Sequence, residues 1–413
     1  MKRVICILVC LCSCLIPCSL QTAAKEAIST PDVASAILYE ATTDTVLYEF
    51  NADRRSAPAS MTKVMTAILV LENNPELKGE LTVSKDAVSE EWCWWMDDKH
   101  LFAGEVISYE DCMNYLLIPS GNEAATAMAI DIAGSVPAFV KMMNDKAAEL
   151  GCDSTHFEDP HGLSGAPHQT TPRDMLKICL YAMKFDRFRE IVCKKSGQVP
   201  ASNMREYPFF YQTTNLVMDP RNIAVYRTEF TDEIIGIKTG TTDEAGYCLS
   251  ACMETGGLSF YSVVMGGKDT LASDGVVRQG NFLDTVTLFT YAHDFVRSGF
   301  AAGETVCTAT LSVKGEPVVP LVAEEDLFVL TEEGQTVEPV FQADKELKLP
   351  IRAGARVGTL TVTDIFGNVH SVGACTNQDL GHPIFLLILI PILFLLLVFI
   401  GFLLYRRRTK QRV

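Results

Sequence analysis

The sequence lacks several features that would point to common functional classes. It contains no C-x-x-C pair joined by a second pair or by histidines, so nothing supports a zinc site. It also contains no internal repeat and no low-complexity tract, which argues against a repeat protein. Tryptophan is scarce, and its three copies fall within one short stretch, 89–104.

Positive charge is also scarce outside the two ends of the chain. The first 24 residues and the last eight hold seven of the 35 basic residues and no acidic one. The rest of the chain carries 28 basic residues against 51 acidic ones, a balance of −23. Such an excess of acid argues against nucleic acid or an anionic lipid surface as a partner, and it indicates a solvated acidic surface.

The N-terminal 24 residues have the layout of a secretory signal peptide. Lys2 and Arg3 precede the apolar stretch 4–20, and small residues follow at 22–24. An N-terminal membrane anchor needs a longer span, and lipid attachment at Cys18 sits badly beside Pro17. We therefore expect export and cleavage near residue 24.

No charge occurs between residues 384 and 405, and five basic residues follow within 406–413. An apolar run of this length matches the thickness of a bilayer, and a basic flank stays on the cytoplasmic side. A buried core helix is the alternative, but no globular sequence follows to surround it. The expected location is the cell membrane, with a single pass and the main body on the extracytoplasmic side.

Cysteines number 14, and five of them lie in the expected signal peptide. Nine cysteines remain, which is an odd number, and their spacing specifies no disulfide pairing. Several can act as small buried apolar residues. They are Cys93, Cys112, Cys152, Cys179, Cys193, Cys248, Cys252, Cys307 and Cys375.

The secondary-structure pattern predicts an α/β (α+β) domain. Residues 33–50 form a β-hairpin pattern, and 109–187 have helical periodicity. Three short strands follow at 233–240, 246–254 and 258–267, and then an amphipathic helix at about 276–295. The economical arrangement is one antiparallel sheet built from both ends of the domain, with helices on its faces.

Short strands separated by Gly, Pro and Asp turns follow, which predicts a small all-β domain. The expected divisions are 1–24 signal peptide, 25–302 catalytic domain, 303–375 small all-β domain, 376–383 linker, 384–405 transmembrane helix and 406–413 basic cytoplasmic tail.

Ser60 and Lys63 lie at the start of an apolar helical run that ends at Asn73. Residues three apart on a helix share a face, with Cβ atoms about 5–6 Å apart. A serine becomes a strong nucleophile when an adjacent base takes its proton, and a lysine can do so only when burial or a second cation lowers its pKa. Taken alone, S-x-x-K is better explained by a helix-starting serine with a surface lysine, although Lys63 lies within the apolar run.

Two further motifs change the interpretation. Ser120 and Asn122 lie in a tight turn between an apolar helix and a small-residue helix, and such a turn can present a hydroxyl and an amide to a cleft. Lys238-Thr239-Gly240 ends an apolar strand, where an ammonium and a hydroxyl could hold a carboxylate. Each fragment is common as an ordinary turn or strand end, but all three in this order are improbable by chance.

Together S-x-x-K, S-x-N and K-T-G resemble the serine β-lactamases and penicillin-binding proteins. The stretches "APASMTKVMTA", "LLIPSGNEAA" and "GIKTGTTDEAGYCLSA" narrow the resemblance to the D-alanyl-D-alanine carboxypeptidases, the low-molecular-mass penicillin-binding proteins. The resemblance covers about residues 30–375 and implies a β-lactamase/transpeptidase-like catalytic domain followed by a small all-β domain.

This resemblance also implies roles for individual residues and implies no metal or other cofactor. Ser60 would form the acyl-enzyme, Lys63 would be its general base and Ser120 would relay a proton. Asn122 would bind the acyl side chain, and Lys238 and Thr239 would bind the terminal carboxylate of peptidoglycan stem peptides that end in D-Ala-D-Ala. Gly240, which has no side chain, would let the peptide backbone approach. The N–H groups of Ser60 and Thr241 would form the oxyanion hole. β-Lactam antibiotics would acylate Ser60.

The sequence departs from the resemblance in two places. The family usually has a less distinctive sequence where this chain has Trp92, Trp94 and Trp95. These tryptophans could serve as packing residues, as a substrate lip or as a membrane-facing patch. The C-terminal apolar span replaces the amphipathic surface helix of many relatives. His161 and His168 are interpreted as structural, because a Ser–Lys pair leaves no task for a histidine base.

Three alternative functions share these motifs. A class A β-lactamase also needs a deacylating glutamate in an E-x-x-x-N stretch, and no such stretch occurs at a suitable place between the second and third motifs. A non-catalytic β-lactam or peptidoglycan sensor would bind without turnover. A D,D-endopeptidase would use the same residues on cross-links.

Overall fold

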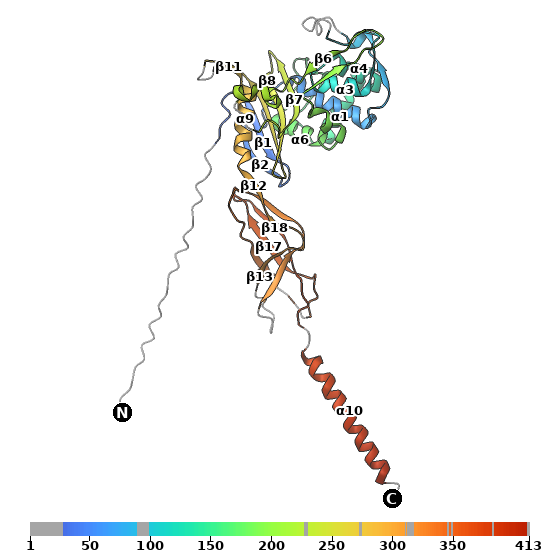
Figure 1. Cartoon of the computed structure of the whole chain (residues 1–413), viewed down its shortest axis with the longest axis vertical. Helices are drawn as coiled ribbons and strands as arrows, with labels where there is room; N and C mark the ends of the chain where they lie inside the picture. Colours follow the sequence, from blue (N-terminus) through green and yellow to red (C-terminus); the bar gives the residue numbers. More distant parts are fainter. Residues whose placement is uncertain are drawn as a thin grey trace, which may run out of the picture.

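The computed structural model describes residues 28–88, 99–226, 230–271, 275–309, 311, 318–344, 347, 350–381 and 384–410. The expected signal peptide, Cys93 and the three tryptophans lie outside the described residues. Figure 1 shows the arrangement of the parts: a mixed α/β domain, then a β-domain, then the C-terminal helix.

The central sheet has five antiparallel strands in the order β2-β1-β9-β8-β7, which confirms the predicted sheet built from both ends of the domain. The hairpin at the N-terminal end joins the three later strands through the pairing of β1 with β9. The strands are β1 (Ser35–Glu40), β2 (Thr45–Phe50), β7 (Ile234–Thr242), β8 (Gly246–Thr255) and β9 (Leu258–Gly267).

Both faces of the sheet are covered, so alternate residues of a strand enter different cores. Cys248 and Cys252 of β8 pack with the helical insert, whereas Leu249 and Ala251 pack with α9 (Gly280–His293). This helix is shorter than the predicted 276–295. Its first predicted residues instead pair in a hairpin, β10 (Asp269–Leu271) with β11 (Val277–Gln279).

The helical insert packs around α1, whose residues 63–71 are all buried. Three of the surrounding helices begin with a side-chain cap, in which Ser108, Ser135 or Thr171 accepts a hydrogen bond from the N–H three residues later. The insert contains α1 (Lys63–Asn73), α3 (Tyr109–Leu117), α4 (Asn122–Ala133), α5 (Val136–Glu149), α6 (Pro172–Ala182) and α7 (Asp186–Val192).

Short elements complete the α/β domain and frame the site. They are the 3-10 turns η1 (Ala59–Thr62), η2 (Lys85–Ala87), η3 (Leu216–Met218) and η4 (Pro220–Asn222), the helix α8 (Ile223–Tyr226), and the paired strands β3 (Glu80–Thr82) with β4 (Val106–Ser108) and β5 (Ser196–Val199) with β6 (Phe209–Gln212).

The predicted small β-domain is present. Its main sheet has the order β13-β14-β18-β17-β16, and a second ladder pairs β12 with β15. Phe295 of β12 contacts Phe366 edge-on with ring centroids 5.9 Å apart and Tyr291 of α9 with ring centroids 5.1 Å apart, which joins the β-domain to α9. The strands are β12 (Phe295–Phe300), β13 (Thr305–Ala309), β14 (Val319–Ala323), β15 (Leu327–Glu332), β16 (Val340–Ala343), β17 (Arg356–Thr363) and β18 (Val369–Thr376).

The chain ends in the helix α10 (Ile384–Lys410), which contains Pro391. Within the described residues, no single helix meets the length and hydropathy criteria for a membrane span. The bent pair α4 and α5 meets them together by composition, and 388–404 forms a shorter apolar helix. Since α4 and α5 pack on α1 in the core of the insert, we treat them as core helices.

Candidate active site

Ser60 and Lys63 meet at the junction of η1 and α1. Ser60 lies in the 3-10 turn that follows Pro58, and Lys63 is the first residue of α1. The Lys63 Nζ and Ser60 Oγ atoms are 2.8 Å apart. The predicted juxtaposition of the hydroxyl and the amine is therefore present, although the chain reaches it through a 3-10 turn instead of a regular α-helix.

The Lys63 amine has three polar neighbours, and two of them can only accept. Asn122 Oδ1 lies 2.7 Å and the His161 carbonyl oxygen 3.0 Å from Nζ. A neutral amine has two N–H donors and one lone pair. When both acceptors take a donor, the lone pair is left for the Ser60 hydroxyl. The contacts thus orient a neutral Lys63 as the acceptor of the serine proton.

Burial makes that neutral form accessible. Lys63 is fully buried, and burial lowers the pKa of its amine to about 7, against the opposing attraction of Asp159 and Glu123. A large share of the molecules therefore carries an uncharged amine at neutral pH. Burial and a second cation were the two possible causes of a lowered Lys63 pKa. Burial is the dominant one, and a second cation is not needed.

Ser120 and Asn122 flank the turn between α3 and α4. Ser120 has a positive φ of 76°, which is uncommon for a residue with a side chain. Asn122 is the first residue of α4, and this position brings its amide to Lys63. Ser120 and Asn122 line the same cleft as Thr239 and Gly240 of the third motif.

Lys238, Thr239, Gly240 and Thr241 lie on β7, the edge strand of the sheet. Lys238 is 2% exposed and donates to the Thr239 carbonyl oxygen at 3.1 Å. Burial, and to a lesser degree Lys63, holds the pKa of Lys238 well below its usual range. The Thr239 hydroxyl is hydrogen-bonded to the hydroxyl of Thr214, which sequence reasoning did not select.

Gly240 lets β7 approach the nucleophile closely. A Cβ at this position would lie 2.7 Å from the Pro58 carbonyl oxygen and 3.0 Å from the Ser60 nitrogen. Both are backbone atoms, so neither can rotate away. The absence of a side chain at 240 therefore sets the distance between the strand and Ser60.

We expect Gly240→Ala to lower the free energy of unfolding by roughly 1–3 kcal/mol, because a methyl group would be forced into packed backbone. Urea unfolding followed by circular dichroism measures the change. Gly165→Ala is the matched control, since its Cβ would meet only the Glu244 side chain, at 3.6 Å. Equal stability of the two variants would contradict the close approach.

The loop after α5 supplies the part of the site that sequence reasoning missed. It is fixed by Thr62 of η1, whose hydroxyl is hydrogen-bonded to His168 Nε2 at 2.8 Å, and by Thr66 of α1, whose hydroxyl donates to the Pro160 carbonyl oxygen at 2.6 Å. These contacts place the His161 carbonyl at Lys63. A sequence motif cannot identify a functional backbone carbonyl, because any residue type can supply one.

The two histidines of this loop have structural environments, in agreement with the prediction. Burial lowers the pKa of His161 to about 4 and also lowers that of His168. His168 Nδ1 accepts from the Glu158 N–H, so its Nε2 carries the proton donated to Thr62. Asp159 accepts from three backbone N–H groups, those of His161, Gly162 and Ser164, and so fixes the loop.

These elements surround one cleft of about 940 Å³. Predicted site residues on its surface are Ser60, Ser120, Asn122, Thr239, Gly240 and Thr241, while Lys63 and Lys238 lie buried behind it. The cleft also contains residues that the motifs did not indicate: Pro119, His161, Leu163, Ser164, Thr214, Leu216, Thr242, Gln279, Asn281 and Phe282.

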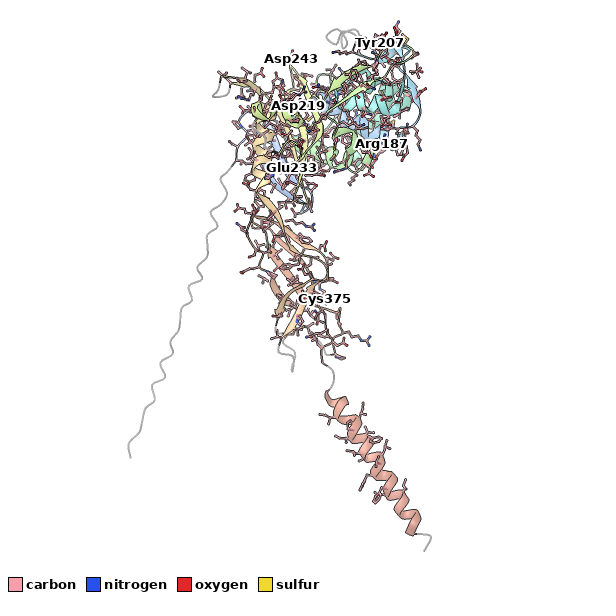
Figure 2. All side chains as sticks on the ribbon, viewed as in Figure 1. Arg187, Tyr207, Asp219, Glu233, Asp243 and Cys375 are labelled. Atoms are coloured by element: carbon pink, nitrogen blue, oxygen red, sulfur yellow. The ribbon has the colours of Figure 1, made fainter. Side chains whose placement is uncertain are left out.

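The cysteines lie outside this constellation. All eight that the structure describes are free thiols, and none lines the cleft. Figure 2 shows Cys375 in the β-domain, well away from the α/β domain. In the described part of the chain, no group of three or more His, Cys, Asp and Glu side chains is placed to hold a metal ion. The described thiols are thus not candidates for the nucleophile.

Known proteins resemble the chain along most of its length. D-alanyl-D-alanine carboxypeptidase DacF of Bacillus subtilis is 29% identical over 339 residues, which cover 80% of this chain and 81% of that protein. The D-alanyl-D-alanine endopeptidase of Escherichia coli is 30% identical over 231 residues, 55% of this chain and 70% of that protein. Penicillin binding protein 5 from Haemophilus influenzae has the same fold, with a TM-score of 0.61, 23% identity and coverage of 86% of this chain and 99% of its own.

Two family models account for the two globular parts. The model described as penicillin-binding protein 5, C-terminal domain, matches residues 297–372, the region of the β-domain. The model described as D-alanyl-D-alanine carboxypeptidase matches residues 21–269, which contain all three motifs of the cleft. The chain therefore belongs to the D-alanyl-D-alanine carboxypeptidase family.

Proposed function

We propose that this protein removes the terminal D-alanine from peptidoglycan stem peptides through an acyl-enzyme on Ser60. The observation that carries the proposal is the Lys63 amine, fully buried and 2.8 Å from the Ser60 hydroxyl, with its two other neighbours able only to accept. A serine with an oriented neutral amine is suited to acyl transfer and needs no histidine.

In the acylation step, Lys63 takes the Ser60 proton while Oγ bonds to the carbonyl carbon of the penultimate D-alanine. The N–H groups of Ser60 and Thr241 are assigned to the oxyanion. When the tetrahedral intermediate collapses, the C–N bond breaks and the leaving amine takes the proton that Lys63 received from Ser60, for which Ser120 is the assigned relay. Water then attacks the ester, releases the shortened peptide and returns the proton to Ser60.

The carboxylate of the terminal D-alanine is assigned to Lys238, Thr239 and Gly240. An anion bound there would favour the charged form of Lys238, whose pKa burial holds low in the free protein. Substrate binding would thus be coupled to proton uptake at Lys238. Asn122, which already contacts Lys63, is assigned to the acyl side of the peptide.

The test is release of D-alanine from a pentapeptide ending in D-Ala-D-Ala, with mass spectrometry of the penicillin-treated protein. Hydrolysis together with a stable penicillin adduct on Ser60 would support the proposal. A stable adduct without D-alanine release would favour the sensor, and rapid turnover of penicillin would favour the β-lactamase. Cleavage of cross-linked dimers alone would favour the activity for which the Escherichia coli endopeptidase is named.

We predict that the limiting rate of acylation by saturating penicillin, whose bound carboxylate keeps Lys238 charged, rises with pH and levels off above about 7. The protonated amine has no lone pair, so the rate should fall roughly tenfold for each pH unit below the Lys63 pKa of about 7. Stopped-flow labelling between pH 5 and 9 measures the profile. A flat profile, or a break near 10, would show that a buried amine is not the base.

We also propose that the protein is exported and then held in the cell membrane by its C-terminal end. The uncharged stretch 384–405, the basic residues after it and the signal-like N-terminus support this proposal. A chain that stops after Gly381 should move from the membrane fraction to the soluble fraction. Retention of the truncated chain in the membrane fraction would show that another segment anchors it.

A further inference from the structure

The turn that carries Ser120 and Asn122 lies against a buried tyrosine. The Gly121 N–H donates to the Tyr115 carbonyl oxygen at 2.9 Å, and a Cβ on Gly121 would overlap the Tyr115 ring. The ring thus touches the backbone of the turn directly. Because Ser120 has a positive φ, its conformation depends on surrounding structure that fixes the backbone.

The tyrosine in turn is fixed by a buried carboxylate. The Tyr115 hydroxyl lies 3.0 Å from Glu123 Oε1 and 2.9 Å from the Lys99 carbonyl oxygen. The same Glu123 oxygen accepts from the Leu101 N–H at 3.0 Å. Tyr115 is 0% exposed and Glu123 is 1% exposed, so water cannot replace either partner at low cost.

The ring also contacts aromatic side chains of the β5–β6 hairpin. The centroid of Tyr115 is 5.5 Å from that of Phe209 and 5.8 Å from that of Tyr211. The Arg205 guanidinium lies over Phe209 at 4.5 Å and pairs with buried Glu105. The ring therefore contacts both the Ser120–Asn122 turn and the hairpin that leads to Thr214, another residue that lines the cleft.

Asn122 links the contacts of Tyr115 and Glu123 to the Lys63 amine. It lies between Gly121, which the ring touches, and Glu123, which the hydroxyl contacts, and its amide oxygen accepts from the Lys63 amine. We propose that Tyr115 and Glu123 are positioning residues for acylation of Ser60. These two buried side chains, called here the brace, hold Asn122 at hydrogen-bonding distance from Lys63. The inference rests on the function proposed above.

Tyr115→Phe removes only the hydroxyl. We expect the limiting rate of acylation by a fluorescent penicillin to fall about tenfold, with the saturation constant for the penicillin within about twofold of the wild-type value. Tyr181→Phe is the matched control, because the Tyr181 hydroxyl also donates to a glutamate, Glu72, at 2.6 Å, but near the far end of α1. The control should acylate at the wild-type rate.

Glu123 gives a second test through conservative rescue. Glu123→Gln keeps an oxygen that can accept from Tyr115 and Leu101, so its acylation rate should stay within about threefold of wild type. Glu123→Ala removes the acceptor and should be slowed about as much as Tyr115→Phe. Thermal unfolding of each variant separates loss of folded protein from loss of rate per folded molecule.

The possible outcomes are distinct. Wild-type rates in both Tyr115→Phe and Glu123→Ala, with normal labelling of the wild-type chain, would overturn the brace and leave the proposed function intact. Equal slowing of Tyr115→Phe and Tyr181→Phe would also overturn it, because the effect would then be a general one. A wild-type chain that is never labelled would contradict the proposed function and the brace with it.

Discussion

Replacing Ser60 with alanine is expected to abolish covalent labelling by penicillin and release of D-alanine, while the protein stays folded. The substitution removes one atom, the Oγ that would form the ester, and leaves the backbone N–H assigned to the oxyanion hole. Lys63 keeps its contacts with Asn122 and the His161 carbonyl. Because Ser60 lines the cleft, we expect the free energy of unfolding to change by less than about 1 kcal/mol.

Intact-mass spectrometry after incubation with a penicillin measures the adduct, and circular dichroism measures the unfolding transition. Ser164→Ala is the matched control, because Ser164 lines the same cleft but its hydroxyl has no contact with Lys63. The control should be labelled like the wild type. An adduct on the Ser60→Ala chain would place the nucleophile elsewhere and refute the assignment.

Much of the fold could be predicted because its signals are local. Nearly continuous apolar runs mark β1, β8 and β9, which are covered on both faces, and a β-rich run marks β2. The error at the start of α9 has a local cause as well. Val277 continues the apolar pattern of the helix, yet it pairs with Leu271 in an exposed hairpin, and periodicity alone cannot separate the two states.

The candidate site could be predicted only where side chains carry the chemistry. Spacing places Ser60 beside Lys63, but the complete burial of that amine depends on the packing of the whole insert. The contacts of Lys63 with the His161 carbonyl and of Thr62 with His168 join residues 98 and 106 positions apart in sequence. Tyr115 and Glu123 resemble ordinary core and helix residues until the structure shows what they touch.

Replacing Lys63 with arginine is expected to be as damaging as the loss of Ser60, although it keeps a cation at the same place. A guanidinium stays protonated at every accessible pH and has no lone pair to accept the serine proton. General-base assistance contributes about 10²–10⁴-fold, so acylation should fall by at least about a hundredfold. The acyl-enzyme should then be undetectable on the timescale of wild-type labelling.

A larger, permanently charged group in a fully buried position also threatens folding, so a second substitution is needed to separate the causes. Lys63→Met keeps an unbranched apolar stem, and we expect it to fold, because relief from burying the amine offsets the lost hydrogen bonds to Asn122 and the His161 carbonyl. Because methionine cannot act as a base, the variant should still fail to form the acyl-enzyme. If either variant, folded by circular dichroism, acylated within about tenfold of the wild-type rate, a group other than Lys63 would have to take the serine proton.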